Sequence, residues 1–189
     1  MQGERMEDII IQRAQEGDQL AFQQLIEAYN ALAWRTAQVL LPEQAVVEDV
    51  VQEAWLDVWR GLARFQRGRP FRPWLLTIVA NRCRMTTRRH QPALASLDSA
   101  DAQQLLSDDD VLGHVIRLEE DGELQLVLAT VVAEQRQVLE LRFFADLDLN
   151  EIALITDVPL GTVKSRLHRA LNSLRQRLKS TEEAWKETS

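Results

Sequence analysis

Apolar residues recur along most of the chain at spacings of three and four, and the sustained alternation of a β-strand is not seen. The spacing predicts two helices over 9–29 and 31–41, the second ending before a proline, and a third over 46–62. A fourth is expected over 73–89, because proline is tolerated in the first turn of a helix. The pattern therefore predicts an all-α protein.

The composition changes between residues 92 and 123, where nine acidic residues accompany one arginine and no aromatic residue. Such a segment has too little apolar surface to fold by itself, so we expect an acidic flexible linker with a short helical piece near 111–118. Helical spacing resumes at residue 124. The expected organisation is two small helical domains, 1–91 and 124–180, joined by the linker 92–123 and followed by a polar tail, 181–189.

The C-terminal domain has the pattern of a helix-turn-helix over 148–178. Asp148 and Glu151 form a capping box that starts a short helix, and residues 156–159 (Thr-Asp-Val-Pro) end it. A longer helix follows, and its apolar positions fall on one face: Val163, Leu167, Ala170, Leu171, Leu174 and Leu178.

Charge is distributed unevenly, although the chain as a whole is acidic, with 22 Lys and Arg against 29 Asp and Glu. Residues 61–91 carry eight arginines and no acid, and residues 161–179 carry six cations and no acid. A solvated surface helix usually mixes both signs, so a purely cationic face on the second helix favours binding in the major groove of DNA. Thr162 and the free N–H groups at the start of this helix suit a backbone phosphate.

The helix over 46–62 has an unusual polar face. Asp49, Gln52 and Glu53 lie there together with Leu56 and Trp59. Apolar side chains among carboxylates are typical of a protein-binding patch, and the alternative is a tryptophan folded back onto its own domain.

Arginines alternate with aromatic residues in the segment that follows, an arrangement that suits single-stranded nucleic acid. Trp74, Ile78 and Met85 also share one helical face, which is compatible with a core position. Asn81 lies on the same face, either as a satisfied core amide or as a functional group.

The sequence offers little for catalysis or metal binding. Cys83 is the only cysteine, the three histidines are scattered, and no Ser/His/Asp or Cys/His order is visible. The acidic run 108–110 is better explained by the linker than by a metal site. We therefore expect neither enzymatic activity nor a cofactor. No apolar run approaches the length of a membrane span, so we expect a cytoplasmic protein without membrane insertion.

Three motifs in fixed order resemble the bacterial sigma factors of the extracytoplasmic-function (ECF) group. They are DVVQEAWLDVWR at 49–60, PWLLTIVANRCR at 73–84 and EIALITDVPLGTVKSRLHRAL at 151–171. The resemblance implies a protein that recruits core RNA polymerase to promoters, recognises the −10 and −35 elements and assists DNA melting. It also implies an anti-sigma factor as a partner, wedged between the two domains, and a linker that threads toward the RNA exit path.

The resemblance assigns three sets of residues. The clamp helices of the largest polymerase subunit would bind Asp49, Gln52, Glu53, Leu56 and Trp59. The −10 element would meet the segment 60–89, with Asn81 near an extruded base, through Arg72, Trp74, Asn81, Arg82, Arg84, Arg88 and Arg89. The −35 element would meet Arg142, Thr162, Lys164, Ser165, Arg166, His168 and Arg169.

Two positions depart from the family pattern. Met85 stands where the family usually has Asn or Asp, and Val132-Ala133 stands where it commonly has Leu-Pro. The rival interpretation is a stand-alone helix-turn-helix regulator that binds duplex DNA by itself, usually as a dimer. Association with core polymerase separates the two.

Overall fold

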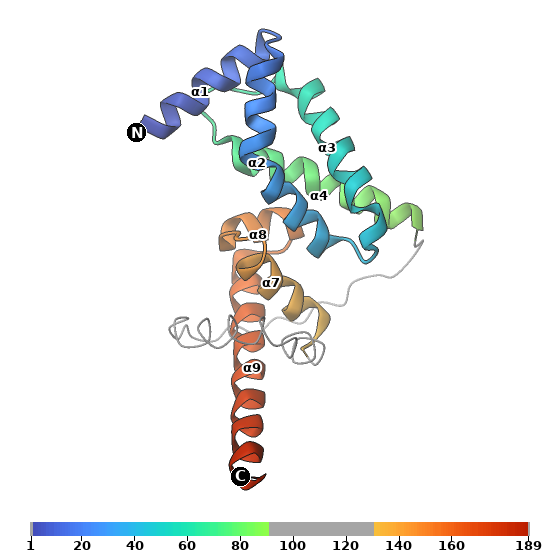
Figure 1. The fold of residues 1–189 in the computed structure, drawn as a ribbon, viewed down its shortest axis with the longest axis vertical. Coiled ribbons are helices and arrows are strands. Elements are labelled where there is room, and N and C mark those ends of the chain that lie inside the picture. Colours follow the sequence, from blue (N-terminus) through green and yellow to red (C-terminus); the bar gives the residue numbers. More distant parts are fainter. Residues whose placement is uncertain (1, 91–130, 189) are drawn as a thin grey trace. The chain divides into compact units, whose positions relative to one another are not determined.

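The computed structural model describes residues 2–90 and 131–188, and these residues are built from helices without any strand (Figure 1). They form two compact units, one N-terminal and one mostly C-terminal. The all-α prediction is therefore confirmed. The expected linker and its helical piece near 111–118 fall outside the described residues. Among the described helices, none has a stretch long and apolar enough to span a bilayer.

The N-terminal unit contains α1 (Gln2–Gln15), α2 (Gln19–Leu40), α3 (Val47–Leu62) and α4 (Phe71–His90), with a short 3-10 turn η1 (Gln44–Val46) before α3. The predicted ranges of α3 and α4 agree with the structure to within two residues. Pro73 lies in the first turn of α4, where its missing N–H costs no helical hydrogen bond.

The boundary between α1 and α2 differs from the prediction, which placed one helix over 9–29 and a break at residue 30. Gly17 ends α1 with a φ of 92°, a backbone conformation that favours glycine. Asp18 then caps α2, and its carboxylate accepts hydrogen bonds from the N–H groups of Leu20 (2.9 Å) and Ala21 (3.1 Å). The prediction was wrong because the apolar periodicity crosses this Gly-Asp stop and start signal without interruption.

The core of the N-terminal unit lies between α1, α2, α3 and α4. All the apolar residues predicted for one face of α3 are buried: Val47, Val50, Val51, Ala54, Trp55, Val58 and Leu62. They pack with Ile11, Leu25, Phe71 and Leu75 from the other helices. Cys83 of α4 belongs to this core, and burial raises the pKa of its thiol to about 12.

The C-terminal unit contains α7 (Ala133–Phe143), α8 (Leu149–Thr156) and α9 (Leu160–Thr188), with α7 packed against α9. The capping box of α8 is confirmed. The Asp148 carboxylate accepts from the N–H groups of Asn150 (2.7 Å) and Glu151 (2.8 Å), and the Glu151 carboxylate accepts from the Asp148 N–H (2.9 Å). Asp157 ends α8 in the left-handed conformation, with a φ of 59°.

The apolar face predicted for α9 is buried at Val163, Leu167, Ala170, Leu171 and Leu174. The structure carries α9 on to Thr188, so residues 181–188, which the sequence predicts as a polar tail, continue the helix. Glu, Ala and Lys favour helix, and neither glycine nor proline interrupts this stretch.

Candidate nucleic-acid interface

The first half of α9 presents the polar residues expected to contact duplex DNA. Thr162, Lys164, Ser165, Arg166, His168 and Arg169 all lie within the first ten residues of this helix. Lys164 is exposed and the other five are partly exposed. Because the apolar face of α9 is buried and no acidic residue lies in its first turn, this end of α9 is cationic on its outer side.

Local hydrogen bonds order several of these side chains. Ser165 donates from its hydroxyl to the Thr162 carbonyl (3.0 Å), and Nε2 of His168 lies 2.9 Å from Nδ2 of Asn172. Arg142, the remaining member of the set, belongs to α7. Its guanidinium donates to the Leu147 carbonyl (3.1 Å), which ties it to the turn before α8.

The residues expected to bind the polymerase share one face of α3. Asp49, Gln52, Glu53 and Leu56 are exposed at spacings of three and four, and Leu56 is 53% exposed. Trp59 is 39% exposed and makes an edge contact with the ring of Phe22, with centroids 4.7 Å apart. The indole is thus partly folded onto its own domain through α2, and it still presents an open edge, so its role in protein binding stays a prediction.

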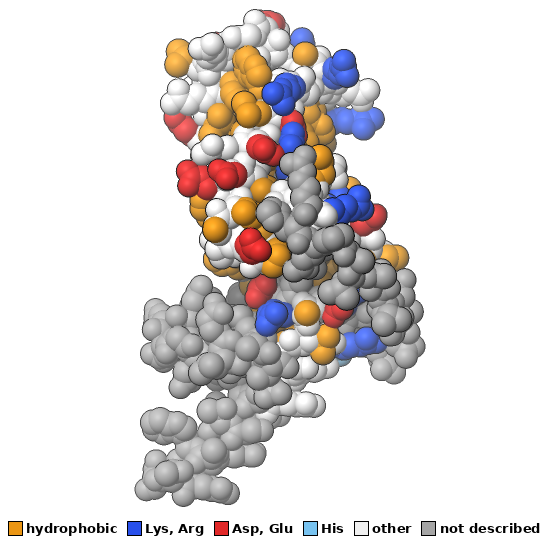
Figure 2. Space-filling view, turned by 90° about the vertical axis from the view of Figure 1, so that its right-hand side faces the viewer, with side chains coloured by type: hydrophobic (Ala, Val, Ile, Leu, Met, Phe, Trp, Pro, Cys, Tyr) orange, Lys and Arg blue, Asp and Glu red, His pale blue; other side chains and the backbone are white. Residues whose placement is uncertain are grey.

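Charge changes sign along α3, from Glu48 and Asp49 in its first turn to Arg60 in its last. This order agrees with the helix dipole, which favours acids at the N-terminus and cations at the C-terminus. Figure 2 shows one face of the N-terminal unit, on which acidic side chains gather in the middle and basic side chains lie mainly toward one end.

Arg82 of α4, predicted to bind DNA, is engaged with α3 instead of pointing freely into solvent. Its Nε donates to the Asp57 carboxylate, and its Nη1 lies 2.9 Å from Oε2 of Glu53. The hydrogen bond from Arg82, opposed by partial burial, holds the pKa of Asp57 below its usual value. Arg82 therefore connects the helix expected to bind DNA with a residue expected to bind polymerase.

The other members of this set are spread over several faces of α4. Trp74, Asn81 and Arg88 are seven residues apart, so they follow one line along the helix. Arg84 donates to Oδ1 of Asn81. Arg72 precedes Trp74 by two residues and so lies about 200° away around the helix. Arg89 occupies the last turn, and its side chain is outside the described part of the chain.

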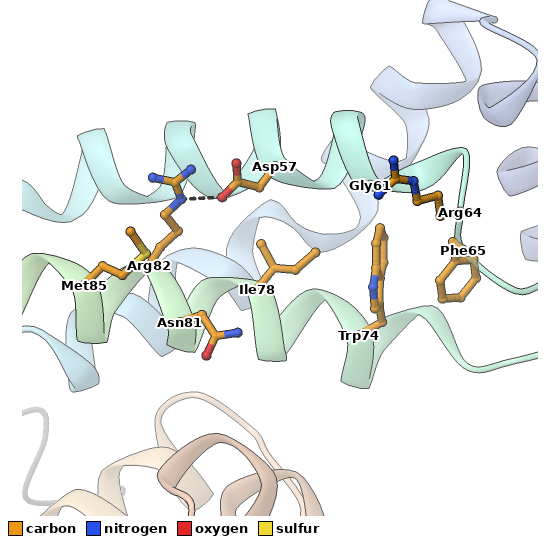
Figure 3. Close-up of a pocket in the computed structure, with 9 residues that line it drawn as sticks. All are labelled: Asp57, Gly61, Arg64, Phe65, Trp74, Ile78, Asn81, Arg82 and Met85. Atoms are coloured by element: carbon orange, nitrogen blue, oxygen red, sulfur yellow. Dashed lines mark hydrogen bonds and ion pairs between the residues drawn. The ribbon is translucent and has the colours of Figure 1, made fainter.

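A groove of about 360 Å³ runs between the end of α3 and the exposed side of α4 (Figure 3). Its walls combine two aromatic side chains, aliphatic groups, an amide, a carboxylate and two arginines: Asp57, Gly61, Arg64, Phe65, Trp74, Ile78, Asn81, Arg82 and Met85. Figure 3 shows Trp74 and Arg82 reaching from α4 toward α3, whereas Asn81 points away from α3. Asn81 is exposed, so its interpretation as a core amide was wrong.

Close packing shapes one end of this groove. A Cβ atom added at Gly61 would lie 3.2 Å from Cζ2 of Trp74, so the absence of a side chain leaves space for the indole. Trp74 also packs against Phe65, with ring centroids 4.7 Å apart. Met85 is 47% exposed at the other end, so the expectation that it belongs to the core was wrong.

Arg64 is the functional candidate that the sequence sets left out. It lies in the connection 63–70 between α3 and α4 and lines the groove together with Trp74. The arginine count of 61–91 includes it, but helical periodicity gave no means of placing a residue outside a helix. Within the described residues, no cluster of three His, Cys, Asp or Glu side chains could hold a metal ion.

Comparison with known families matches both units of the chain. Residues 25–93 match the model of Sigma-70 region 2, and residues 127–176 match Sigma-70, region 4. The ECF RNA polymerase sigma-E factor of Escherichia coli K12 is 30% identical over 176 residues, which cover 89% of this chain and 92% of that protein. The ECF RNA polymerase sigma factor SigW of Bacillus subtilis is 28% identical over 177 residues, covering 89% and 95%.

Two solved structures share the fold at lower identity. CnrH, in complex with the cytosolic domain of CnrY, superposes with a TM-score of 0.61 at 24% identity, covering 92% of this chain and 97% of CnrH. The sigma factor RpoE of Bartonella quintana, in complex with the anti-sigma factor NepR, gives a TM-score of 0.56 at 23% identity, covering 84% and 96%.

Proposed function

This chain belongs to the ECF group of RNA polymerase sigma factors. We propose that its helices present three separate surfaces, two that recognise the promoter and one that binds the polymerase. As a sigma factor it binds core RNA polymerase and directs initiation at specific promoters. In our assignment α9 reads the −35 element, α4 with the connection 63–70 holds the −10 strand, and α3 docks on the polymerase. The observation that carries the assignment is the separation of these chemistries onto different helices, each with its own buried face.

The α9 surface suits duplex DNA. An α-helix fits the major groove, and the residues in its first turns come nearest to the base edges. Lys164 and Arg166 supply charge for phosphates, while Arg169 has the fork of donors that pairs with guanine. Thr162 lies at the start of the helix, where free N–H groups accept a phosphate oxygen.

The α4 surface suits a separated strand. Trp74 offers an aromatic plane at the groove, and Asn81 and Arg88 continue the same line over about 20 Å of helix. Stacking of a base on an aromatic side chain contributes about 1–3 kcal/mol, comparable with the few kcal/mol that extruding a base costs. The sequence contains no phosphate-binding loop of the Gly-rich Lys-Ser/Thr type, so binding rather than nucleotide hydrolysis supplies the energy of opening. In this assignment the chain carries out no turnover of its own.

The α3 surface suits a cationic protein partner. Carboxylates surround the exposed Leu56 and the edge of Trp59, which is the composition of a docking site with an apolar centre and a charged rim. The RpoE relative was solved with an anti-sigma factor. We assign to this chain a similar protein antagonist, which would act in the cytoplasm by competing with the polymerase.

The −35 assignment is tested with Arg169→Ala in holoenzyme reconstituted from this chain and core polymerase. The variant should lose about 1–3 kcal/mol of promoter affinity and relax the preference at one position of the −35 element. Arg175→Ala is the matched control, because Arg175 lies further along α9 and outside the assigned set. A uniform loss across all promoter sequences would reduce Arg169 to a phosphate contact.

The polymerase assignment is tested with Leu56→Glu against Met6→Glu, which changes an apolar residue on α1 that is at least as exposed. Only Leu56→Glu should weaken binding to core polymerase, by at least about tenfold, since a charge replaces the apolar centre of the patch. Equal effects of the two substitutions, measured by titration with labelled core enzyme, would remove α3 from the docking surface.

A further inference from the structure

The connection between α3 and α4, residues 63–70, carries three arginines and has little regular structure of its own. Arg64, Arg67 and Arg69 are all exposed, and Gly68 turns the chain with a φ of 79°. Phe65 is the one buried side chain of this segment. A segment of this kind needs contacts from elsewhere to hold its cations in fixed positions.

Gln15, the last residue of α1, supplies such contacts. Its Nε2 donates to the carbonyl of Leu62 (2.9 Å) and to the carbonyl of Phe65 (2.8 Å), and both bonds are partly buried. Its Oε1 accepts from Nε of Arg67 (3.0 Å). The Gln15 amide thus donates two hydrogen bonds and accepts one. Its three partners lie about fifty residues away in the sequence.

The two carbonyls lie where α3 gives way to the connection. Leu62 is the last residue of α3, and its carbonyl accepts from the Phe65 N–H (3.0 Å) in the turn that follows, so Gln15 adds a second hydrogen bond to it. Gln12, one turn earlier on α1, behaves differently, because its Nε2 donates to the carboxylate of Glu16, which lies at the surface just after the end of the helix. The same residue type therefore makes a local bond at one position and a long-range one at the other.

We propose that Gln15 is a positioning residue for −10 recognition: it fixes the connection 63–70 so that Arg64 is held at the groove and Arg67 is held on the Gln15 amide. Gln15 acts through these arginines and has no contact with DNA in this scheme. The inference rests on the proposed function of the groove. It extends that function to α1, which lies before the residues matched to Sigma-70 region 2.

The test compares Gln15→Met with Gln12→Met, which removes an amide of the same helix that does not contact the connection. Limited trypsin digestion of the full chain reports on the connection, because trypsin can cleave after the exposed Arg64 and Arg67, whereas the Arg69–Pro70 bond resists it. Cleavage there should be about tenfold faster in Gln15→Met than in Gln12→Met, since local opening becomes easier. Affinity of the holoenzyme for a single-stranded −10 oligonucleotide should fall about fivefold, while affinity for core polymerase stays unchanged.

Gln15→Glu separates the donated bonds from the accepted one. It keeps an acceptor for Arg67 but places a carboxylate against two carbonyl oxygens, so it should behave like Gln15→Met. Wild-type behaviour of Gln15→Glu would overturn the role of the donated bonds.

Three results would overturn the proposal. The first is unchanged cleavage in Gln15→Met. The second is a loss of thermal stability and core affinity that parallels the loss of −10 binding, which would show general destabilisation. The third is faster cleavage with unchanged −10 affinity while Arg64→Ala weakens −10 binding. If Arg64→Ala and Arg67→Ala also leave −10 affinity unchanged, the proposed function of the connection fails together with the inference.

Discussion

The α9 helix and the α3–α4 pair position their Lys and Arg side chains in different ways. On α9 the core residues and the polar residues occupy opposite faces, so packing and DNA contact are assigned to different side chains. On the α3–α4 pair, Arg82 bonds to Asp57 and Glu53 of the neighbouring helix and also lines the groove. A substitution on α9 can therefore change binding alone, whereas one at Arg82 changes the packing of two helices and their surfaces together.

The largest expected effect on stability comes from Arg82→Ala. It leaves Asp57, whose side chain is 30% exposed, without its strongest partner, and we expect a loss of about 1–2 kcal/mol in the free energy of unfolding. Urea denaturation followed by tryptophan fluorescence measures it, since four of the five tryptophans (34, 55, 59 and 74) lie in the N-terminal unit. Arg169→Ala on α9 should stay within about 0.5 kcal/mol of wild type; an equal loss there would erase the contrast between the two regions.

Asp148→Ala is expected to cost about 1 kcal/mol, and the loss should be confined to the C-terminal unit. It removes the side-chain acceptor for two N–H groups at the start of α8. Helical circular dichroism should detect the earlier transition, while tryptophan fluorescence of the N-terminal unit should not. Asp148→Asn keeps an oxygen acceptor and serves as the control; a shift of the fluorescence transition would mean that the two units unfold together.

A smaller effect is expected from Asp57→Asn, and it depends on pH. The pKa of Asp57 is lowered in the folded protein, chiefly by the hydrogen bond from Arg82, so its stabilising contribution is present above the ordinary value of 3.8. This contribution is lost as pH falls through the lowered folded value. Urea midpoints measured from pH 7 down to pH 3 should therefore fall less steeply in Asp57→Asn. An identical pH dependence in both proteins would contradict the role given to this pair.

The smallest change in stability is expected for Gly61→Ala. Alanine is favoured over glycine within a helix by about 1 kcal/mol, but its Cβ would lie 3.2 Å from the Trp74 ring, and overpacking costs about 1 kcal/mol or more. The net effect on the unfolding free energy should be close to zero, because the half-buried indole can tilt. The same tilt should alter binding of a −10 oligonucleotide. A large destabilisation would show that the indole is held rigidly.

Much of the C-terminal unit was predictable because its signals are local. The capping box at Asp148 and the stop before Pro159 lie within a few residues of the backbone groups that they control, and the buried face of α9 follows from periodicity alone. The faces of α3 were predictable for the same reason, including the exposure of Leu56.

The contacts between distant residues were not predictable from the pattern. The bond of Arg82 to Asp57 spans 25 residues, and the bonds of Gln15 span about fifty, so no helical spacing points to them. Met85 shares a face with Trp74 and Ile78, yet it lies at the open end of the groove, because periodicity fixes the face of a helix and not where the covering helix ends. The assignments of residues to promoter elements remain predictions.

The buried thiol of Cys83 makes this protein convenient for spectroscopy. It is the only cysteine of the chain, it is 2% exposed, and its high pKa keeps it in the unreactive protonated form at neutral pH. A cysteine introduced at Arg69 would then be the single site for a maleimide dye, with no need to remove the native one. Movements of the connection during promoter opening can thus be followed by fluorescence in an otherwise unaltered chain.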